Sequence, residues 1–260
     1  MGLSDRFDVS GARVVVTGAA SGLGLAMAEV MAEGGARVTL ADLDADGLAS
    51  AAERLDARAF ELDVSDPEAV RRLFDEVVAE QGGVDVAFAN AGISLEPGVG
   101  DERGGLEALD VETWRKVLGV NLDGVMFTMR EAARHMKKQG SGKIVVTAST
   151  AGFGTDPMVG YSYSATKAAV IILVRQAALE LANHGVHVNA IAPGPFRTNI
   201  GSDAAPIPPE AWEGIVAIGR MAEPDELKGV ALLLASPASS FMTGAVIPVD
   251  GGQLLMSHGV

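Results

Sequence analysis

The chain has 260 residues, of which 48% are hydrophobic and 5% aromatic, and its formal net charge is −14 at pH 7. This length and composition fit one large domain with a sizeable core, and the acidic balance argues against nucleic acid and anionic membranes as partners. Because the sequence contains no cysteine, thiol catalysis, disulfide bonds and cysteine-ligated metals are excluded.

The hydropathy pattern predicts a soluble, cytoplasmic protein. Residues 1–8 contain no apolar core of signal-peptide length, and no apolar run approaches the ~20 residues of a membrane span. The four histidines are scattered without His-x-x-x-His spacing, so we expect no metal site. A Gly-x-Ser-x-Gly motif is also absent, which removes the usual sign of a hydrolase nucleophile.

From residue 12 onward, short β-branched runs alternate with longer Ala/Leu/Glu segments, a pattern typical of βαβ units and a parallel sheet. Strands are predicted at 13–17, 37–41, 57–62, 84–89, 143–148, 187–191 and 244–249. Helices are predicted at 25–33, 67–80, 111–139, 163–184 and 226–235. No interdomain linker or repeat interrupts this alternation, so we expect a single domain spanning residues 1–260.

A glycine-rich turn joins the first strand to the first helix. It contains Gly18, Ser21, Gly22, Leu23 and Gly24 in a Gly-x-x-x-Gly-x-Gly pattern. Glycines here permit a tight turn and let a pyrophosphate approach the backbone, with the amides of the following helix facing the phosphates. The alternative is an ordinary glycine-rich connection without a ligand.

Asp42 ends the second strand, roughly 20 residues beyond the glycines, with Leu43 next to it. An acid at this position can accept hydrogen bonds from the adenosine ribose hydroxyls and repel a 2′-phosphate. No arginine or lysine lies in the glycine turn or just after Asp42, so NAD is preferred over NADP. Asp42 could instead cap a helix, but Asp44 and Asp46 are better placed for that role.

The third and fourth strands also end in small or acidic residues: Asp63 and Val64, then Asn90, Ala91 and Gly92. Open parallel sheets bind ligands at these carboxyl ends.

Residues 93–110 combine one proline, four glycines and five acids, and are predicted to form a flexible excursion. In the next helix Asn121 lies between two apolar residues, where asparagine has low propensity. It has either a special role or that of a buried structural amide.

Tyr163 and Lys167 lie four residues apart in a predicted helix, on one face and with Cβ atoms roughly 6 Å apart. Free tyrosine titrates near pH ~10, and a nearby ammonium favours its anion, so this pair suits proton transfer. Ser149 and Thr150 follow the fifth strand. The sixth strand leads into residues 193–198 and a proline-rich segment, and residues 195–222 are predicted to cover a substrate.

Taken together, these motifs resemble the short-chain dehydrogenase/reductase family over nearly the whole chain, from about residue 9 to 252. Eight family motifs occur in order: Thr-Gly-x-x-x-Gly-x-Gly at 17–24, the acid at 42, Asp-Val at 63–64, Asn-Ala-Gly at 90–92, Asn121, Ser149, Tyr-x-x-x-Lys at 163–167 and Pro-Gly-x-x-x-Thr at 193–198. The resemblance implies a Rossmann-type doubly wound domain whose mainly parallel seven-stranded sheet has the order 3-2-1-4-5-6-7. It also implies a homotetramer.

The family's roles carry over to the matching residues as implications of this resemblance. Tyr163 would be the general acid/base. Lys167 would lower the pKa of Tyr163 and hold the nicotinamide ribose. Ser149 would hydrogen-bond the reacting oxygen, and Asn121 would hold a water that links Lys167 to solvent. The cofactor would be bound by residues from several of these motifs: the glycine turn, Asp42, Leu43, residues 63–64 and 90–92, Tyr163, Lys167, Pro193, Gly194, Phe196 and Thr198.

Four departures from the family pattern stand out. The interval from Ser149 to Tyr163 is one residue longer than usual, so Thr150 competes for the serine role. Tyr161 is a second tyrosine, but no lysine follows it four residues later. Ala89 replaces the first residue of the family's Asn-Asn-Ala-Gly. The 93–110 excursion is longer than in many relatives.

The sequence thus predicts an NAD-dependent oxidoreductase that interconverts a small or medium apolar secondary alcohol and a ketone. One alternative is a 3-oxoacyl-carrier-protein reductase, against which Asp42 and the lack of a basic docking patch argue. Another is a dinucleotide-binding regulator without turnover.

Overall fold

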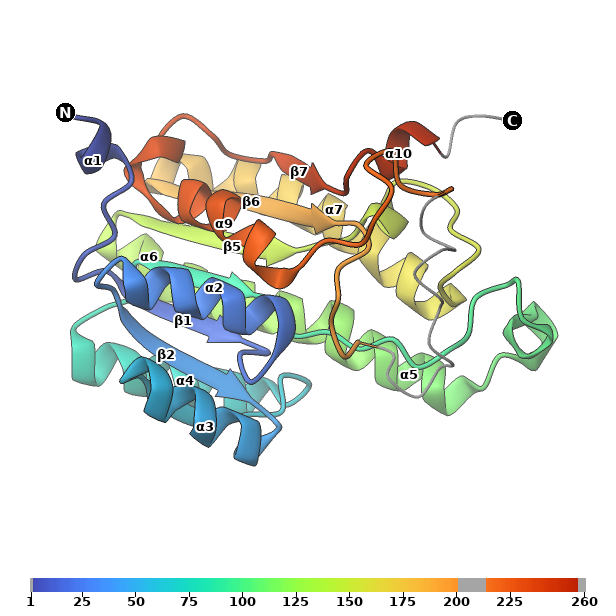
Figure 1. The fold of residues 1–260 in the computed structure, drawn as a ribbon. Helices are drawn as coiled ribbons and strands as arrows, with labels where there is room; N and C mark the ends of the chain where they lie inside the picture. Colours follow the sequence, from blue (N-terminus) through green and yellow to red (C-terminus); the bar gives the residue numbers. More distant parts are fainter. Residues whose placement is uncertain (1, 201–213, 257–260) are drawn as a thin grey trace.

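Seven parallel strands form one sheet in the order β3-β2-β1-β4-β5-β6-β7 (Figure 1). The structure is a computed structural model that describes residues 2–200 and 214–256. The strands are β1 (Arg13–Thr17), β2 (Arg37–Asp42), β3 (Arg58–Glu61), β4 (Val86–Ala89), β5 (Gly142–Thr147), β6 (Val186–Pro193) and β7 (Val246–Val249). The predicted fold class and strand order are confirmed.

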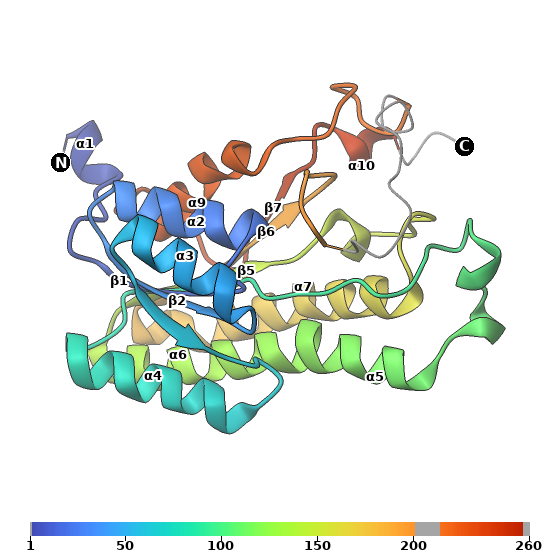
Figure 2. The ribbon, with the colours of Figure 1, turned by 60° about the horizontal axis from the view of Figure 1, so that its bottom comes forward.

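Helices cover both faces of the sheet (Figure 2). One face carries α2 (Gly22–Glu33), α3 (Ala45–Leu55) and α9 (Lys228–Ala235). The other carries α4 (Pro67–Gln81), α5 (Val111–Leu118), α6 (Val125–Gln139) and α7 (Tyr161–Leu181). Two short helices, α1 (Leu3–Arg6) and α10 (Gln253–Met256), lie near the ends of the chain.

Two hydrophobic cores form because the strands bury side chains on both faces. In β1, Val15 belongs to the core under α4, α6 and α7, while Val14 and Val16 belong to the core under α2, α3 and α9. This alternation follows from the two-residue period of a strand. It explains why β1 is a continuous apolar run rather than an alternating one, as expected of parallel sheets with both faces covered.

The predicted helix 111–139 is interrupted. After α5 the chain makes a π-helical turn, η3 (Gly119–Gly124), and then continues as α6. Asn121 lies inside this turn. The first long helix also differs from prediction, because α2 begins at Gly22 rather than at Leu25, so the last two glycines of the turn belong to the helix itself.

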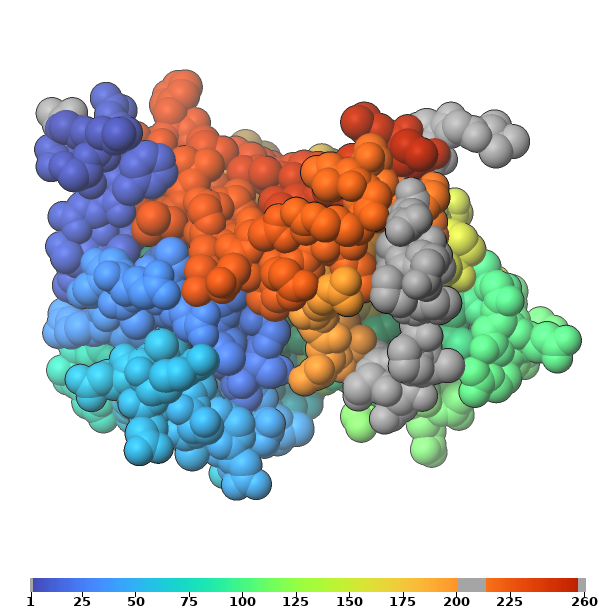
Figure 3. Space-filling view, in the orientation of Figure 1, coloured from blue at the N-terminus to red at the C-terminus, as the bar shows by residue number. Residues whose placement is uncertain are grey.

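The 93–110 excursion protrudes from one end of the molecule, in green in Figures 1 and 3. It contains only two short 3₁₀ turns, η1 (Glu102–Gly104) and η2 (Leu106–Ala108). The predicted cover at 195–222 is described only in part, since residues 201–213 lie outside the described residues. Among the residues that are described, no helix is long and apolar enough to cross a membrane.

Candidate active site

The glycine turn meets the Asn-Ala-Gly segment where β1 and β4 lie side by side, the point at which the strand order reverses. Gly18 has φ +68°, and a Cβ placed on it would lie 2.7 Å from Ala91 Cα. A Cβ on Gly24 would overlap the Gly18 carbonyl oxygen. Since no side chain fits at either position, the two loops can only approach this closely because these residues are glycines.

Asn90 links the ends of three strands. Its Nδ2 donates to the carbonyl oxygens of Thr17 and Gly18, both at 3.1 Å, and its Oδ1 accepts from Thr147 Oγ1 at 2.9 Å. The side chain of Asn90 therefore shapes the site through internal hydrogen bonds. The backbone N–H of Ala91 is also used internally, since it donates to Thr17 Oγ1 at 3.3 Å.

The first turn of α2 presents backbone amides at the carboxyl edge of the sheet. Ser21 is the N-cap residue, and its side chain makes no capping hydrogen bond within the described structure. The first amides of a helix lack intrahelical acceptors, which makes this turn suitable for a phosphate. A Cβ on Gly22 would lie 3.4 Å from Thr198 Cγ2, so the Pro-Gly-x-x-x-Thr segment closes over the same turn.

The Asp42 carboxylate faces the glycine turn. Its Oδ2 accepts from the backbone N–H of Ala20 at 2.9 Å, and its Oδ1 accepts from that of Asp44 at 3.0 Å. Asp44, by contrast, caps α3 by accepting from Gly47 N, as the sequence predicted. Leu43 is 64% exposed beside Asp42 and offers an apolar surface.

Asp63 and Val64 also lie at this carboxyl edge of the sheet. The Oδ1 of Asp63 accepts from both the backbone N–H and the hydroxyl of Ser65, at 2.8 and 2.7 Å. Val64 is buried, and its side chain lies so close to Gly124 that a Cβ there would come within 2.7 Å of Val64 Cγ2. This segment is thus held against the π-helical end of α6.

Lys167 is a buried cation, with 2% of its surface exposed. Its Nζ donates to the carbonyl oxygen of Thr147 at 2.8 Å and lies 5.6 Å from the centroid of the Tyr163 ring. Burial disfavours the ammonium form and lowers the pKa of Lys167 to about 8.

The Tyr163 hydroxyl is affected most by desolvation, which raises its pKa above the usual value, while a hydrogen bond with the Ser149 side chain acts in the opposite direction. The sequence predicted that Lys167 lowers the pKa of Tyr163. In the structure burial has the largest effect on the pKa of Tyr163, so the surroundings of its hydroxyl favour the protonated phenol.

Ser149 and Thr150 differ in how their hydroxyls are used. Ser149 Oγ accepts from Ala151 N at 3.2 Å and interacts with Tyr163. Thr150 Oγ1 lies against the carbonyl oxygen of Pro193 at 3.3 Å and donates to Gln253 Oε1 at 2.9 Å. The Thr150 hydroxyl is therefore occupied by the end of β6 and by α10.

Asn121 is fully buried and pairs twice with the backbone of Ile93. Its Nδ2 donates to Ile93 O, and its Oδ1 accepts from Ile93 N, both at 2.8 Å. A Cβ on Gly92 would lie 3.4 Å from Asn121 Oδ1 and 3.6 Å from Lys167 Nζ. Asn121, Lys167 and the Asn-Ala-Gly segment therefore converge at one place.

The loop after β6 completes the edge. A Cβ on Gly194 would lie 2.8 Å from Asp250 Cα and 3.0 Å from Gln253 Oε1, so this glycine permits close contact with the segment after β7. Phe196 is buried and forms an isolated bridge with Ala222. The structure thus brings the sequence-predicted residues to one edge of the sheet. It also adds Ile93, Glu96 and Gln253, which no motif marked.

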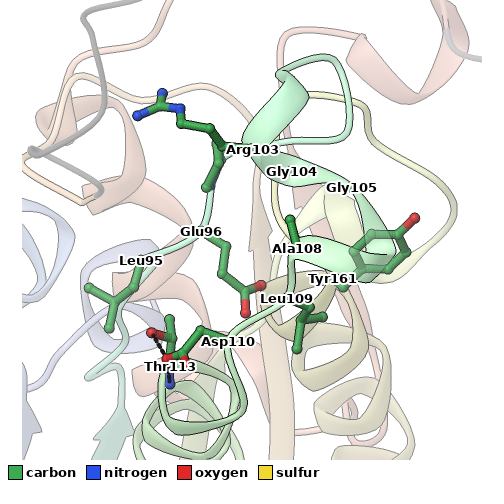
Figure 4. A pocket seen from close by; sticks show the side chains of 11 residues that line it. Leu95, Glu96, Arg103, Gly104, Gly105, Ala108, Leu109, Asp110, Thr113 and Tyr161 are labelled. Carbon is green, nitrogen blue, oxygen red and sulfur yellow. Dashed lines mark hydrogen bonds between the residues drawn. The ribbon is translucent and has the colours of Figure 1, made fainter.

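A cavity of about 150 Å³ lies beneath the excursion (Figure 4). It is lined by Leu95, Glu96, Pro97, Arg103, Gly104, Gly105, Ala108, Leu109, Asp110, Thr113 and Tyr161. Tyr161, the second tyrosine, therefore lines this cavity. Within residues 2–200 and 214–256, no group of three or more histidine, aspartate or glutamate side chains is arranged to hold a metal ion.

Comparisons with known proteins agree with this geometry. Residues 18–253 match a family model described as enoyl-(acyl carrier protein) reductase. The chain is 42% identical over 245 residues to cis-4-hydroxycyclohexanecarboxylate dehydrogenase of Sinomonas cyclohexanicum, covering 92% of this chain and 94% of that protein.

Two crystal structures are also similar. A short-chain type dehydrogenase/reductase from Mycobacterium marinum has a TM-score of 0.89 at 37% identity, covering 97% of this chain and 99% of that one. A 3-ketoacyl-(acyl-carrier-protein) reductase from Brucella melitensis, complexed with NADH, has a TM-score of 0.87 at 30% identity, covering 94% and 99%.

Proposed function

The chain belongs to the short-chain dehydrogenase/reductase family and is an oxidoreductase, and from this premise we propose that it interconverts a secondary alcohol and a ketone with NAD(H). The observation that carries the proposal is the convergence of Ser149, Tyr163 and Lys167 beside Gly92 and Asn121 at the switch point of the sheet.

The glycine turn fits a dinucleotide. The glycines of the turn have no side chains that would fill the space beside the first turn of α2. The backbone amides of that turn are suited to bind a pyrophosphate. Residues 18–24 would hold the phosphates, Asp42 and Leu43 the adenosine, and Asp63 to Val64 the adenine side. Residues 90–92, 193–198, Tyr163 and Lys167 would hold the nicotinamide end. The bound nicotinamide would supply hydride transfer.

Tyr163 donates or accepts the proton at its phenolic oxygen. Burial favours the neutral phenol, which is the form that donates a proton to a carbonyl oxygen during reduction. During oxidation the phenolate must form, and the Lys167 ammonium stabilises that charge. Ser149, which hydrogen-bonds Tyr163, orients the substrate oxygen. The Thr150 hydroxyl is occupied elsewhere, which supports Ser149 in this role.

The water that links Lys167 to solvent would be held by the main chain of Asn121 rather than by its side chain. Its side-chain oxygen and nitrogen each bond to Ile93. In a π-helical turn some backbone carbonyls lose their usual i→i+4 partner. The main-chain oxygen of Asn121 is therefore the group we assign to hold a relay water near Lys167.

NAD is the proposed cofactor because the Asp42 carboxylate lies against the glycine turn and no basic side chain accompanies it in the sequence. A 2′-phosphate would meet like charge there. The substrate would lie between the excursion, residues 151–162 and the described residues 195–200 and 214–220. The exposed side chains of Leu95 and Phe153 in two of these segments favour an apolar alcohol. The similarity to a cyclohexane-alcohol dehydrogenase supports a cyclic substrate.

The main competing function is reduction of a 3-oxoacyl group on an acidic carrier protein. Asp42 alone does not argue against it, because the similar reductase from Brucella melitensis is complexed with NADH. The net charge of −14 argues against it more strongly, since an acidic carrier needs a basic docking surface. A regulator without turnover is the second alternative, and the assembled Ser149, Tyr163 and Lys167 argue against it.

Self-association is part of the proposal. Ile172 and Leu179 on α7 are 60% and 75% exposed, and apolar side chains on a helix surface favour burial against another subunit. We propose a homotetramer, as in the family.

The test combines a panel of cyclic, aromatic and aliphatic secondary alcohols with NAD, read as kcat/KM. Tyr163→Phe should lower kcat at least ~10²-fold while NADH binding is kept, the scale expected of a general acid. Tyr161→Phe is the matched control and should leave kcat within about twofold, because no lysine faces it four residues on. Near-native turnover of Tyr163→Phe would refute the assignment, and no reduction of NAD by any alcohol would favour a regulator.

A further inference from the structure

The helix that carries Tyr163 and Lys167 is capped from outside itself. The N-cap residue of α7 is Gly160, which has no side chain to offer. Instead, Ser162 donates twice to Glu96 Oε2, from its backbone N–H at 3.0 Å and from its hydroxyl at 2.7 Å. Glu96 lies 66 residues earlier, at the start of the excursion. A carboxylate thus takes up an amide of the first turn that has no acceptor within the helix.

The backbone is shaped for this contact. Pro97 and Val159 form an antiparallel bridge, and Gly100 N donates to Pro157 O at 3.4 Å. A Cβ on Gly160 would collide with the side chain of Glu96. The excursion is therefore fitted against the segment that leads into α7, and the glycine allows Glu96 to reach the helix.

The charge of Glu96 is compensated by the helix. Its other oxygen, Oε1, is buried and has no hydrogen-bond partner among the described residues. Arg103 lines the same cavity but pairs with Asp101 at 2.8 Å, and in Figure 4 its guanidinium points away from the Glu96 carboxylate. The positive end of the α7 macrodipole is then the main favourable partner for this anion.

We propose that Glu96 is a positioning residue for Tyr163, and that the excursion orients the general acid/base through this carboxylate. Ser162 directly precedes Tyr163, so the bond to Glu96 fixes the turn from which the phenol extends. A displacement of ~1 Å in a reacting group can cost on the order of 10²-fold in rate. The inference rests on the proposed function, because it assigns Glu96 to the same reaction.

Three variants test the inference. Glu96→Ala removes the acceptor, Glu96→Gln keeps a carbonyl oxygen that can accept from Ser162, and Glu102→Gln removes an exposed carboxylate from the same excursion. Glu102 makes no side-chain hydrogen bond or ion pair within the described part of the chain, so it is the matched control.

Two measurements apply to each variant: kcat and KM for NAD with the best alcohol, and amide hydrogen exchange in peptides spanning residues 158–166. Glu96→Ala should lower kcat about tenfold with KM for NAD within about twofold, and should speed exchange in 158–166 about fivefold, the scale of a lost cap. Glu96→Gln should recover most of kcat, and Glu102→Gln should match the wild type.

A Glu96→Ala protein with native kcat, or with an equal loss of kcat in Glu102→Gln, would overturn the inference. If Glu96→Ala does not fold, Ser162→Ala decides instead, because it removes the hydroxyl that donates to Glu96 Oε2: unchanged kcat and unchanged exchange in that variant would also overturn the inference. The exchange measurement needs no substrate. Failure of the proposed function would appear separately, as a wild type without turnover whose 158–166 exchange still depends on Glu96.

Discussion

Asp42→Asn should remove most of the discrimination between NADH and NADPH. Asp42 stands at the end of β2, with both carboxylate oxygens fixed by the backbone N–H groups of Ala20 and Asp44. Because the carboxylate cannot easily turn away, a 2′-phosphate at the adenosine end would meet a fixed negative charge.

The size of the effect follows from Coulomb's law. Two unit charges about 5 Å apart at an effective dielectric constant of about 20 repel by about 3 kcal/mol, which is roughly 10²-fold in affinity. Screening by solvent at this partly exposed site reduces the figure, so the wild type should bind NADH about 30- to 100-fold more tightly than NADPH. In Asp42→Asn the ratio should fall to a few-fold.

The same substitution should weaken NADH itself. An asparagine oxygen can accept from only one of the two backbone amides in this geometry, and its NH₂ group would face the other. The carboxylate would also accept hydrogen bonds from the adenosine ribose hydroxyls, and hydrogen bonds to a charged group are worth about 1.5–3 kcal/mol, so we expect NADH affinity to fall about tenfold or more when the charge is removed.

Titration of the two coenzymes by the quenching of intrinsic fluorescence measures both quantities. Asp44→Asn is the matched control, because it removes the same charge two residues away while Asp44 serves only to cap α3. Equal affinities of the wild type for NADH and NADPH, or the same change in the ratio for Asp44→Asn, would refute the reasoning.

Two further predictions concern the catalytic side. Ser149→Ala should lower kcat at least about tenfold with little change in melting temperature. Thr150→Val should keep most of the activity but lose about 1–3 kcal/mol of stability, because it removes a buried hydrogen bond. The opposite pattern would give the catalytic role to Thr150. The pKa of Lys167 is lowered to about 8 by burial, so between pH 8 and 10 the unfolded chain binds more protons than the folded one and stability should rise with pH. Urea unfolding at pH 7.5 and 10 should show wild type gaining about 2–3 kcal/mol relative to Lys167→Met, and a constant difference would contradict this.

The fold and the gathering of the motif residues at one edge of the sheet could be predicted from sequence because their signals are local. A β-branched run followed by glycines, such as 13–24, specifies a strand, a turn and a helix start within a dozen residues. Most of the motifs then fall at the ends of strands, and parallel pairing brings those ends together. The pair 163/167 lies in a helix, and its spacing became a strong signal only together with the other motifs.

Several features that the sequence did not reveal depend on contacts between distant residues. The cap from Glu96 spans 66 residues, and the bond from Thr150 to Gln253 spans 103. The desolvation that raises the pKa of Tyr163 was missed as well, since the helical spacing shows the neighbouring ammonium but not the burial of the hydroxyl. Burial is a property of the packed molecule, and no four-residue pattern reveals it.

The π-helical turn at Gly119–Gly124 has a consequence for how this helix can change. One residue more than a regular α-helix requires is accommodated there, so the faces of α5 and α6 are out of phase by about 100°. Removing any single residue of the turn would let the two segments merge into one uniform rod, with a complete ladder of backbone bonds, and would swing Asn121 off Ile93. A regular α-helix through residues 119–124 is therefore incompatible with the native position of Asn121.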